Sequence, residues 1–265
     1  MSARNENLLR GKTALVTGAS SGLGVDFARE LAARGCHLVL VARREELLRQ
    51  HAEEIRAAHG VRVSVVAMDL AAKDAPQALY DRLTAEGVAV DVLVNNAGYG
   101  LYGPFTQLDW ERERNMLELD IITLVHLSKL FARDMVARNF GFMLHVASIA
   151  SYQPSPLYAS YGAAKSFVLH FGEALSYELR RTNVRSTVVA PGVTATEFLK
   201  VSGQEATLYQ RLAMMTSEQV ARAGIEAMLK GRPSIVTGRF NALAAFTMRL
   251  LPRRAQAALA EITMR

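Results

Sequence analysis

Two kinds of segment alternate along the chain. Short, continuous apolar runs, such as HLVLVA at residues 37–42, are typical of strands that are buried on both faces of a sheet. Longer segments between them carry apolar residues at helical spacing and charged residues at the remaining positions. Strands are predicted at residues 12–17, 37–42, 62–67, 90–94, 141–147, 184–190 and 234–237. Helices are predicted at residues 23–34, 43–59, 73–86, 108–138, 158–181 and 217–230.

This order of elements predicts an α/β fold. A strand, a helix and a further strand imply a right-handed crossover, and repeated crossovers build a parallel sheet with helices on both faces. We therefore predict a doubly wound, seven-stranded parallel sheet that binds its ligands at the carboxyl ends of the strands. The length suits one domain, at residues 1–238, followed by an extension at residues 239–265. Residues 195–215 lack a clear period, and we expect them to form a mobile flap.

A glycine-rich segment, TGASSGLG at residues 17–24, joins the first predicted strand to the first predicted helix. Glycines let the backbone approach a diphosphate, and the N-terminus of the helix supplies N–H donors and a positive potential. An ordinary glycine-rich turn is the alternative interpretation. The position between a strand and a helix favours dinucleotide binding.

Arg43 and Arg44 follow the second predicted strand, where a dinucleotide-binding fold meets the adenosine ribose. An acidic residue there accepts from the 2′-hydroxyl of NAD, whereas an arginine accommodates the 2′-phosphate of NADP. A guanidinium grips a phosphate with two parallel hydrogen bonds. Because no acid ends this strand, the sequence favours NADP(H). The alternative is that both arginines only begin a solvated helix.

Three further strand ends carry small or polar residues. Asp69 ends the third strand, where its carboxylate is placed either to accept from an adenine amino group or to cap the following helix. NNAG at residues 95–98 ends the fourth strand and forms either the floor of a cofactor site or only a turn. PGVTAT at residues 191–196 follows the sixth strand and offers a rigid turn, backbone groups and a hydroxyl for the nicotinamide end.

Tyr161 and Lys165 are the candidates for proton chemistry, because a spacing of four residues places two side chains on one face of a helix. A free phenol has a pKa of about 10, and a nearby ammonium lowers that pKa by favouring the phenolate. Tyr158 is a competing phenol, but no lysine follows it by four residues. Ser148, which ends the fifth strand, is placed to hold a carbonyl oxygen beside Tyr161, and Ser151 is its nearest competitor.

Together these motifs resemble the short-chain dehydrogenase/reductase family in its compact, single-domain Rossmann form. The resemblance runs over residues 12–238 and keeps the family order: TGASSGLG, an acid after the third strand, NNAG, a serine thirteen residues before YxxxK, and PGxxxT. It implies an NADP(H)-dependent oxidoreductase that interconverts a carbonyl and an alcohol by hydride transfer. Tyr161 would exchange the proton, Lys165 would hold the nicotinamide ribose and lower the pKa of Tyr161, and Ser148 would orient the oxygen.

The resemblance also assigns the cofactor contacts. Asp69 would meet adenine, Asn96 the adenosine side, and Val193 and Thr196 the carboxamide or a phosphate. The cofactor-binding residues predicted in this way are Gly18, Ser20, Ser21, Gly22, Leu23, Gly24, Arg43, Arg44, Asp69, Leu70, Asn96, Ala97, Gly98, Tyr161, Lys165, Pro191, Gly192, Val193 and Thr196. No metal is expected.

Asp120 departs from the family pattern, which often places an asparagine at this position of the long helix. Asp120 keeps the backbone carbonyl that such an asparagine uses to hold water near the active lysine. If the carboxylate is buried and ionised near Lys165, it stabilises the ammonium and offsets the field that lowers the pKa of Tyr161. The alternative is that Asp120 points to solvent or caps a local turn.

Two rival functions follow from the same motifs. A non-catalytic NADP-binding redox sensor is one, and the complete set of Ser148, Tyr161 and Lys165 argues against it. An extended sugar-nucleotide epimerase is the other, and it usually needs a larger C-terminal substrate domain. The predicted substrate is hydrophobic, because apolar and aromatic residues could line its pocket: Tyr99, Leu101, Tyr102, Phe105, Tyr152, Pro154, Tyr158, Phe198 and Leu199.

The charge distribution sets the last 36 residues, which include the extension, apart from the rest of the chain. Residues 230–265 hold seven arginines and lysines and one acid, which accounts for the whole net charge of +6. A basic tail is weak evidence for nucleic acid, which usually needs a basic face with a reading element. Leu243, Phe246, Leu250 and Leu251 fall on one helical face before Pro252 interrupts the helix. Docking on the core or on another subunit is expected, and a peripheral membrane contact is the alternative.

Location and assembly are expected to follow the family. The sequence has one cysteine, Cys36, so no intramolecular disulfide can form, which fits a reducing compartment. No apolar run reaches the length of a membrane span, and the polar N-terminus lacks a secretion signal. We expect a cytoplasmic homodimer or homotetramer that acts on a small-molecule carbonyl or alcohol.

Overall fold

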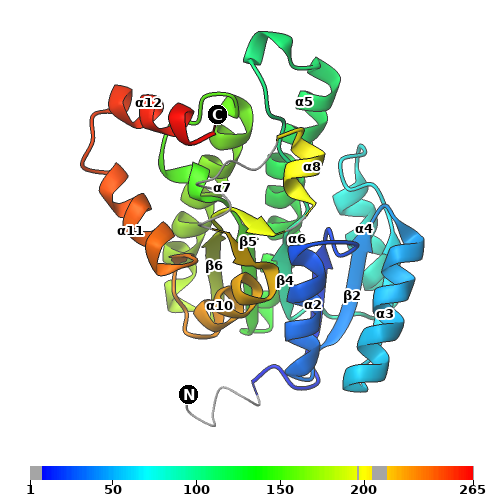
Figure 1. The fold of residues 1–265 in the computed structure, drawn as a ribbon. Helices are drawn as coiled ribbons and strands as arrows, with labels where there is room; N and C mark the ends of the chain where they lie inside the picture. Colours follow the sequence, from blue (N-terminus) through cyan, green and yellow to red (C-terminus); the bar gives the residue numbers. More distant parts are fainter. Residues whose placement is uncertain (1–7, 196, 205–213, 265) are drawn as a thin grey trace.

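A computed structural model describes residues 8–195, 197–204 and 214–264, and it places seven parallel strands in one sheet (Figure 1). The order of the strands is β3-β2-β1-β4-β5-β6-β9, with the crossover from β3 to β4 at the centre. The strands are β1 Thr13–Thr17, β2 His37–Ala42, β3 Val63–Ala67, β4 Val92–Asn95, β5 Gly141–Val146, β6 Val184–Ala190 and β9 Ser234–Val236. The predicted doubly wound fold is therefore confirmed.

Helices cover both faces of this sheet. On one face α2, α3 and α10 share a core with the strands, and on the other face α4, α6 and α7 do so. Neighbouring residues of one strand enter opposite cores, as Leu40 and Val41 do, which explains why the strands are apolar throughout. The helices are α2 Leu23–Ala33, α3 Glu45–His59, α4 Ala75–Ala85, α5 Trp110–Leu117, α6 Leu124–Ala137, α7 Ala159–Glu178 and α10 Ser217–Leu229.

The long helix predicted at residues 108–138 differs from the sequence pattern in two ways. It begins at Trp110, because the side chain of Asp109 accepts from the backbone N–H of Arg112 and caps the helix. A π-helical turn, Glu118–Thr123, then separates α5 from α6. Such a turn inserts an extra residue into the helical ladder and often marks a functional site. Arg43 and Arg44 also lie before α3 and are not part of it.

Short elements complete the fold around the carboxyl ends of the strands. In the predicted flap, β7 Thr194–Ala195 pairs with β8 Met215–Thr216, and α8 Phe198–Ser202 lies between them in sequence. Residues 205–213 of the flap, and Thr196, lie outside the described residues. The described residues also include 3-10 helices at Phe105–Gln107, Ile149–Tyr152 and Leu179–Arg181.

The C-terminal extension forms two helices, α11 Arg239–Met248 and α12 Arg253–Met264, on either side of Pro252. Figure 1 shows them along the edge of the molecule opposite α3 and α4. In the described part of the chain, no helix combines the length and apolar character that crossing a bilayer requires.

Candidate active site

A cleft of about 820 Å³ opens at the carboxyl ends of the strands. Most of the predicted site residues line it, although they come from the ends of six strands and from helix α7. These residues are Gly18, Ser20, Ser21, Gly22, Leu23, Arg43, Arg44, Asp69, Leu70, Asn96, Ala97, Gly98, Ser148, Tyr161, Lys165, Pro191, Gly192 and Val193. Gly24 and Asp120 are not part of its wall, and Thr196 lies outside the described residues.

The glycine-rich segment turns tightly from β1 into α2. Gly18 and Gly22 have positive φ angles of 67° and 57°, which glycine adopts without strain. A Cβ on Gly24 would lie 2.2 Å from the carbonyl oxygen of Gly18, so the first turn of the helix can approach the loop only without a side chain there. The N-terminus of α2 consequently lies at the floor of the cleft, next to Gly22 and Leu23.

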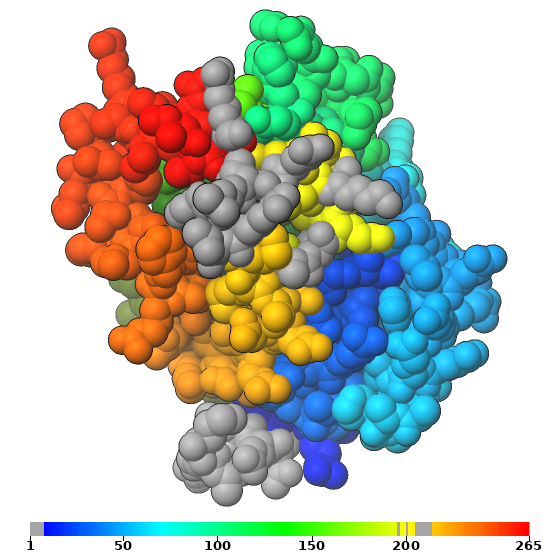
Figure 2. Space-filling model, in the orientation of Figure 1, coloured from blue at the N-terminus to red at the C-terminus, as the bar shows by residue number. Residues whose placement is uncertain are grey.

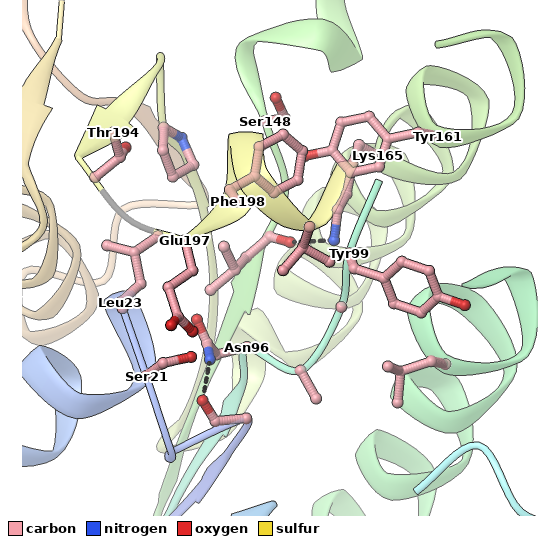
Figure 3. A pocket seen from close by; sticks show the side chains of 18 of the residues that line it. Ser21, Leu23, Asn96, Tyr99, Ser148, Tyr161, Lys165, Thr194, Glu197 and Phe198 are labelled. Atoms are coloured by element: carbon pink, nitrogen blue, oxygen red, sulfur yellow. Dashed lines mark hydrogen bonds between the residues drawn. The ribbon is translucent and has the colours of Figure 1, made fainter. Parts of the chain in front are cut away.

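Asn96 and Thr17 fasten the NNAG turn to the glycine-rich loop. The Asn96 amide donates to the carbonyl oxygen of Thr17 at 2.8 Å and approaches that of Gly18 at 3.3 Å. The Thr17 hydroxyl accepts from the backbone N–H groups of Asn96 and Ala97, both at 3.0 Å. The parallel register of β1 and β4 brings these loops together (Figure 3). The sequence analysis did not identify Thr17 as a residue that joins these loops; its side chain is buried at the end of β1.

Asp69 lies on the cleft wall and shapes the loop in which it stands. Its Oδ1 atom accepts from the backbone N–H of Ala71 at 3.0 Å. The alternative interpretation, in which Asp69 caps the following helix, is wrong, because α4 begins only at Ala75 and Asp74 occupies its N-cap position. The carbonyl of the neighbouring Leu70 accepts from Thr123 at 2.6 Å, which joins this loop to the π-helical turn.

Arg44 reaches over the glycine-rich loop. Its Nε atom donates to Ser20 Oγ at 3.2 Å, and its Nη2 atom donates to Ser21 Oγ at 2.5 Å. The same Nη2 atom lies 3.1 Å from Glu197 Oε2, so an ion pair links the adenosine side of the cleft to the segment that precedes α8. The sequence analysis did not identify Glu197, because 153 positions separate it from Arg44.

Tyr161 and Lys165 lie on one face of α7 and are both buried. Lys165 Nζ lies 5.7 Å from the centre of the Tyr161 ring and donates to the carbonyl oxygen of Val146 at 3.2 Å. It also lies 2.9 Å from Asp120 Oδ2, and Asp120 has no exposed surface. Of the two placements considered for Asp120, the structure therefore has the buried one.

The π-helical turn brings Asp120 to this position. Its Oδ1 atom accepts from the backbone N–H of Tyr99 at 3.2 Å, which fixes the loop after NNAG. A Cβ on Gly98 would lie 2.5 Å from Asp120 Oδ1 and 3.1 Å from Lys165 Nζ, so this loop tolerates only glycine beside the ion pair. Burial raises the pKa of Asp120, and the Lys165 ammonium opposes that rise.

The pKa of Tyr161 differs from the sequence-based expectation. Burial and, secondarily, the negative charge of Asp120 raise the pKa of the phenol, while the interaction with the Ser148 hydroxyl lowers it. The net direction is therefore opposite to the predicted lowering of this pKa, and the contribution of Lys165 itself stays a prediction. Burial is the main reason, and the carboxylate of Asp120, 2.9 Å from the ammonium, opposes the field of Lys165 at the phenol. At neutral pH Tyr161 therefore carries its proton.

Ser148 and its competitor Ser151 have different surroundings. Ser148 lines the cleft at the N-cap of the 3-10 helix that follows β5, and its Oγ accepts from the backbone N–H of Ala150 at 3.2 Å. Ser151 is buried, and its Oγ donates to the carbonyl oxygen of Lys165 at 2.8 Å. Ser148 is consequently the serine that faces the cleft (Figure 3).

Aromatic and apolar side chains line the end of the cleft beyond Tyr161. Tyr158, whose hydroxyl contacts Ser202 and Gln204 at 2.9 Å, belongs to this wall together with Phe198. Burial raises the pKa of Tyr158, so this competing phenol also keeps its proton. Of the nine residues predicted for the substrate pocket, four line the cleft: Tyr99, Tyr158, Phe198 and Leu199. The prediction is wrong for the other five, Leu101, Tyr102, Phe105, Tyr152 and Pro154.

Those five residues lie behind the wall or outside it. Leu101 and Tyr102 pack behind Tyr158, while Phe105 is 61% exposed on the surface. The sequence analysis missed Met264 of α12, which lines the cleft and accepts from Tyr102 through its backbone carbonyl at 3.2 Å. Within the described ranges, no group of three or more His, Cys, Asp and Glu side chains could hold a metal ion.

Comparison with known proteins identifies the family. The family model described as short chain dehydrogenase matches residues 12–207. This chain belongs to that family. A curated relative of this short-chain dehydrogenase, the very-long-chain 3-oxoacyl-CoA reductase of Mycosarcoma maydis, is 37% identical over 187 residues. The aligned part is 69% of this chain but only 53% of the relative, so the chain spans about half the length of the relative.

Solved structures agree with this assignment. A 7β-hydroxysteroid dehydrogenase superposes with a TM-score of 0.87 at 26% identity, over 96% of this chain and 99% of that chain. A short-chain dehydrogenase from Sphingobium yanoikuyae in complex with NADPH has a TM-score of 0.80 at 30% identity, over 93% and 98% of the two chains. Similar chains have been solved with NADPH or with NAD. The glycine cradle and the N-terminus of α2 described above fit the diphosphate of such a cofactor.

Proposed function

We propose that this short-chain dehydrogenase is an NADP(H)-dependent reductase of a hydrophobic carbonyl compound, with Tyr161 as the general acid. The observation that carries the proposal is the convergence of Tyr161, Lys165 and Ser148 on one cleft. In that cleft a proton donor, a cation and a polar hydroxyl lie beside the residues that fit a dinucleotide. A redox sensor without catalytic activity would not need this set.

Arg43 and Arg44 support the choice of NADP(H). Both line the adenosine end of the cleft, and no acidic residue ends β2 to accept from a ribose 2′-hydroxyl. Ser20 and Ser21 hold the Arg44 guanidinium over the glycine-rich loop, which lowers the entropy that is lost when it binds a phosphate. A 2′-phosphate at this end would therefore meet a positioned cation.

The proton chemistry assigns one task to each residue. When bound, the nicotinamide supplies the hydride to the carbonyl carbon or accepts it in the reverse direction. Tyr161 donates its hydroxyl proton to the carbonyl oxygen, since its raised pKa keeps it protonated at neutral pH. Ser148 donates a hydrogen bond to the same oxygen and orients it. Lys165 holds the nicotinamide ribose, and Asp120 positions the Lys165 ammonium from behind.

The wall of the cleft supports a hydrophobic substrate. Tyr158 and Phe198 stack with an angle of 22° between their rings, and Phe198 also packs against Tyr161. Leu199 and Met264 extend this apolar wall. The names of two similar proteins, a very-long-chain 3-oxoacyl-CoA reductase and a 7β-hydroxysteroid dehydrogenase, indicate large apolar substrates. We propose a long-chain or polycyclic ketone.

A substrate screen tests this proposal. Oxidation of NADPH or NADH is followed in separate reactions with a steroid ketone, a long-chain 3-oxoacyl thioester or a polar keto sugar. The three substrates are used at comparable concentrations. The proposal expects turnover of at least one apolar ketone, with NADPH preferred and little activity on the keto sugar. Tight NADPH binding without turnover of any carbonyl would instead support the redox sensor.

A further inference from the structure

The C-terminal extension exposes an apolar surface that the proposed reaction does not use. Fourteen large hydrophobic residues of the described chain are exposed, and half of them lie at residues 239–264, which shows that they are concentrated there. Four of these define the C-terminal apolar face: Leu243, Phe246, Leu250 and Ile262. Their exposed fractions are 61%, 58%, 73% and 73%.

Helix α11 has two distinct sides. Asn241 and Ala245 are buried toward the domain, and the Asn241 amide donates to the carbonyl oxygen of Thr237 at 3.0 Å. Leu243 and Phe246 are three residues apart, which places them together on the opposite side, and Leu250 is exposed in the turn that follows the helix. The helix is therefore already docked through one side and presents an apolar stripe on the other.

Hydrogen bonds near both ends of helix α12 hold it in place. The side chain of Gln256 donates to the carbonyl oxygens of Met248 and Leu251, at 2.9 and 2.8 Å, and ties α12 to the end of α11. At its other end Met264 accepts from Tyr102 and from Gln204. Because these contacts fix the extension on the domain, exposure of the C-terminal apolar face is not the result of an undocked tail.

The same extension carries exposed cations. Arg239, Arg249, Arg253 and Arg254 are all exposed, and the extension contains a single acid, Glu261. In a symmetric dimer through this face, the basic extensions of the two copies would meet, and their positive charges would repel each other. An anionic lipid surface has the opposite charge, and it can accept apolar side chains at the level of the headgroups.

We propose that the C-terminal apolar face and its arginines dock the protein peripherally on an anionic lipid bilayer. Leu243, Phe246 and Leu250 insert at the boundary of headgroups and acyl chains, while the arginines contact the phosphates. Helix α12, which carries Ile262 of this face, also reaches the substrate cleft, where Met264 and the half-exposed Val201 are part of the wall. Figure 2 shows the extension, in orange and red, as one flank of the visible face of the molecule. Docking would place this flank against the membrane.

Vesicle binding of the full-length protein tests the proposal without any measurement of activity. The vesicles contain phosphatidylcholine alone or mixed with phosphatidylglycerol, and the bound fraction is measured by co-sedimentation. We expect binding only to the anionic vesicles, and weaker binding in high salt. The apolar variant, Leu243→Ser with Phe246→Ser and Leu250→Ser, should bind at least tenfold more weakly. The charge variant, Arg253→Gln with Arg254→Gln, should bind these vesicles roughly fivefold more weakly for each arginine that is removed.

A control variant, Phe167→Ser with Tyr177→Ser, removes exposed aromatic residues from α7 and should bind like the wild type. Circular dichroism verifies that each variant is folded. If the apolar variant does not fold, the charge variant still tests the proposal. Failure of the wild type to bind anionic vesicles overturns the proposal, as does unchanged binding of both the apolar and the charge variant. A loss of dimer mass in the apolar variant, with no lipid binding by the wild type, would identify the face as a contact between copies and also overturns it.

Discussion

Asp120 and Lys165 form an ion pair in the interior of the protein, with 2.9 Å between Asp120 Oδ2 and Lys165 Nζ. The π-helical turn brings the carboxylate to this position, and Gly98 leaves the space for it. Removal of one partner of a buried ion pair usually costs about 3–5 kcal/mol, because the other charge stays buried. The pair consequently couples the stability of the fold to the electrostatics of the active site.

Asp120→Asn should shift the pH dependence of carbonyl reduction. The rate requires a protonated Tyr161, so activity is lost as the pH rises through the pKa of that phenol. Asp120 raises this pKa, and its removal also leaves the Lys165 ammonium uncompensated. Both effects lower the pKa of Tyr161, so the alkaline loss of activity should begin at a lower pH. The measurement is kcat/KM against pH with NADPH.

Glu118→Gln is the matched control, because Glu118 lies on the same π-helical turn. Its profile should superimpose on that of the wild type. If the Asp120→Asn profile also superimposes, with the fold intact by circular dichroism, Asp120 has no electrostatic influence on the proton donor.

Glu197→Gln should strengthen binding of NADP(H) and leave binding of NAD(H) unchanged. Under the proposed function Glu197 would compete with the 2′-phosphate for Arg44, and both side chains are about half exposed. A pair of this exposure is worth about 0.2–1 kcal/mol, so the gain should be at most about fivefold. Titration calorimetry with both cofactors measures the change.

Arg44→Ala provides the opposite change for the same calorimetric comparison. Loss of a charge-assisted hydrogen bond to the phosphate should cost about 1.5–3 kcal/mol for NADP(H) alone. Equal affinity of the wild type for NAD(H) and NADP(H) would contradict the assignment of the arginines.

The sequence revealed those parts of the site that stand in local motifs. Tyr161 and Lys165 share one helix, and the glycine-rich segment joins a strand to the next helix, so spacing alone was informative. Glu197 and Met264 reach the site only through contacts between segments far apart in the chain. The π-helical turn that buries Asp120 has no marker in the apolar pattern, which continues on both sides of it. The five predicted pocket residues that lie elsewhere stand in irregular segments or 3-10 helices, whose course no periodic pattern of the sequence sets.

His145 should make the protein less stable in acid. It is buried in β5, where desolvation lowers its pKa to about 4, and its Nδ1 atom contacts the amide of Asn95 at 3.2 Å. Because the pKa of His145 is lower in the folded protein, its neutral imidazole contributes to the free energy of unfolding. This contribution is complete above the unfolded pKa of about 6.5 and is lost as the pH falls toward 4. Between pH 7 and pH 5 the loss should be about 2 kcal/mol.

Urea unfolding of the wild type and of His145→Gln at both pH values isolates this contribution. Glutamine does not titrate, so the free energy of unfolding of the variant should fall less between pH 7 and pH 5. The same decrease in both proteins would show that His145 does not carry the acid sensitivity.

The central claim is that Tyr161 supplies the proton, and single-turnover reduction by the Tyr161→Phe variant tests it most directly. General acid catalysis is typically worth about 10²–10⁴-fold, so the variant should be at least a hundredfold slower than the wild type. Its affinity for NADPH should stay nearly unchanged, because only the hydroxyl is removed. Tyr158→Phe is the control, since Tyr158 is a second buried phenol of the same cleft. The account predicts that Tyr158→Phe keeps the wild-type rate of the chemical step within tenfold, and a Tyr161→Phe rate within tenfold of the wild type would contradict it.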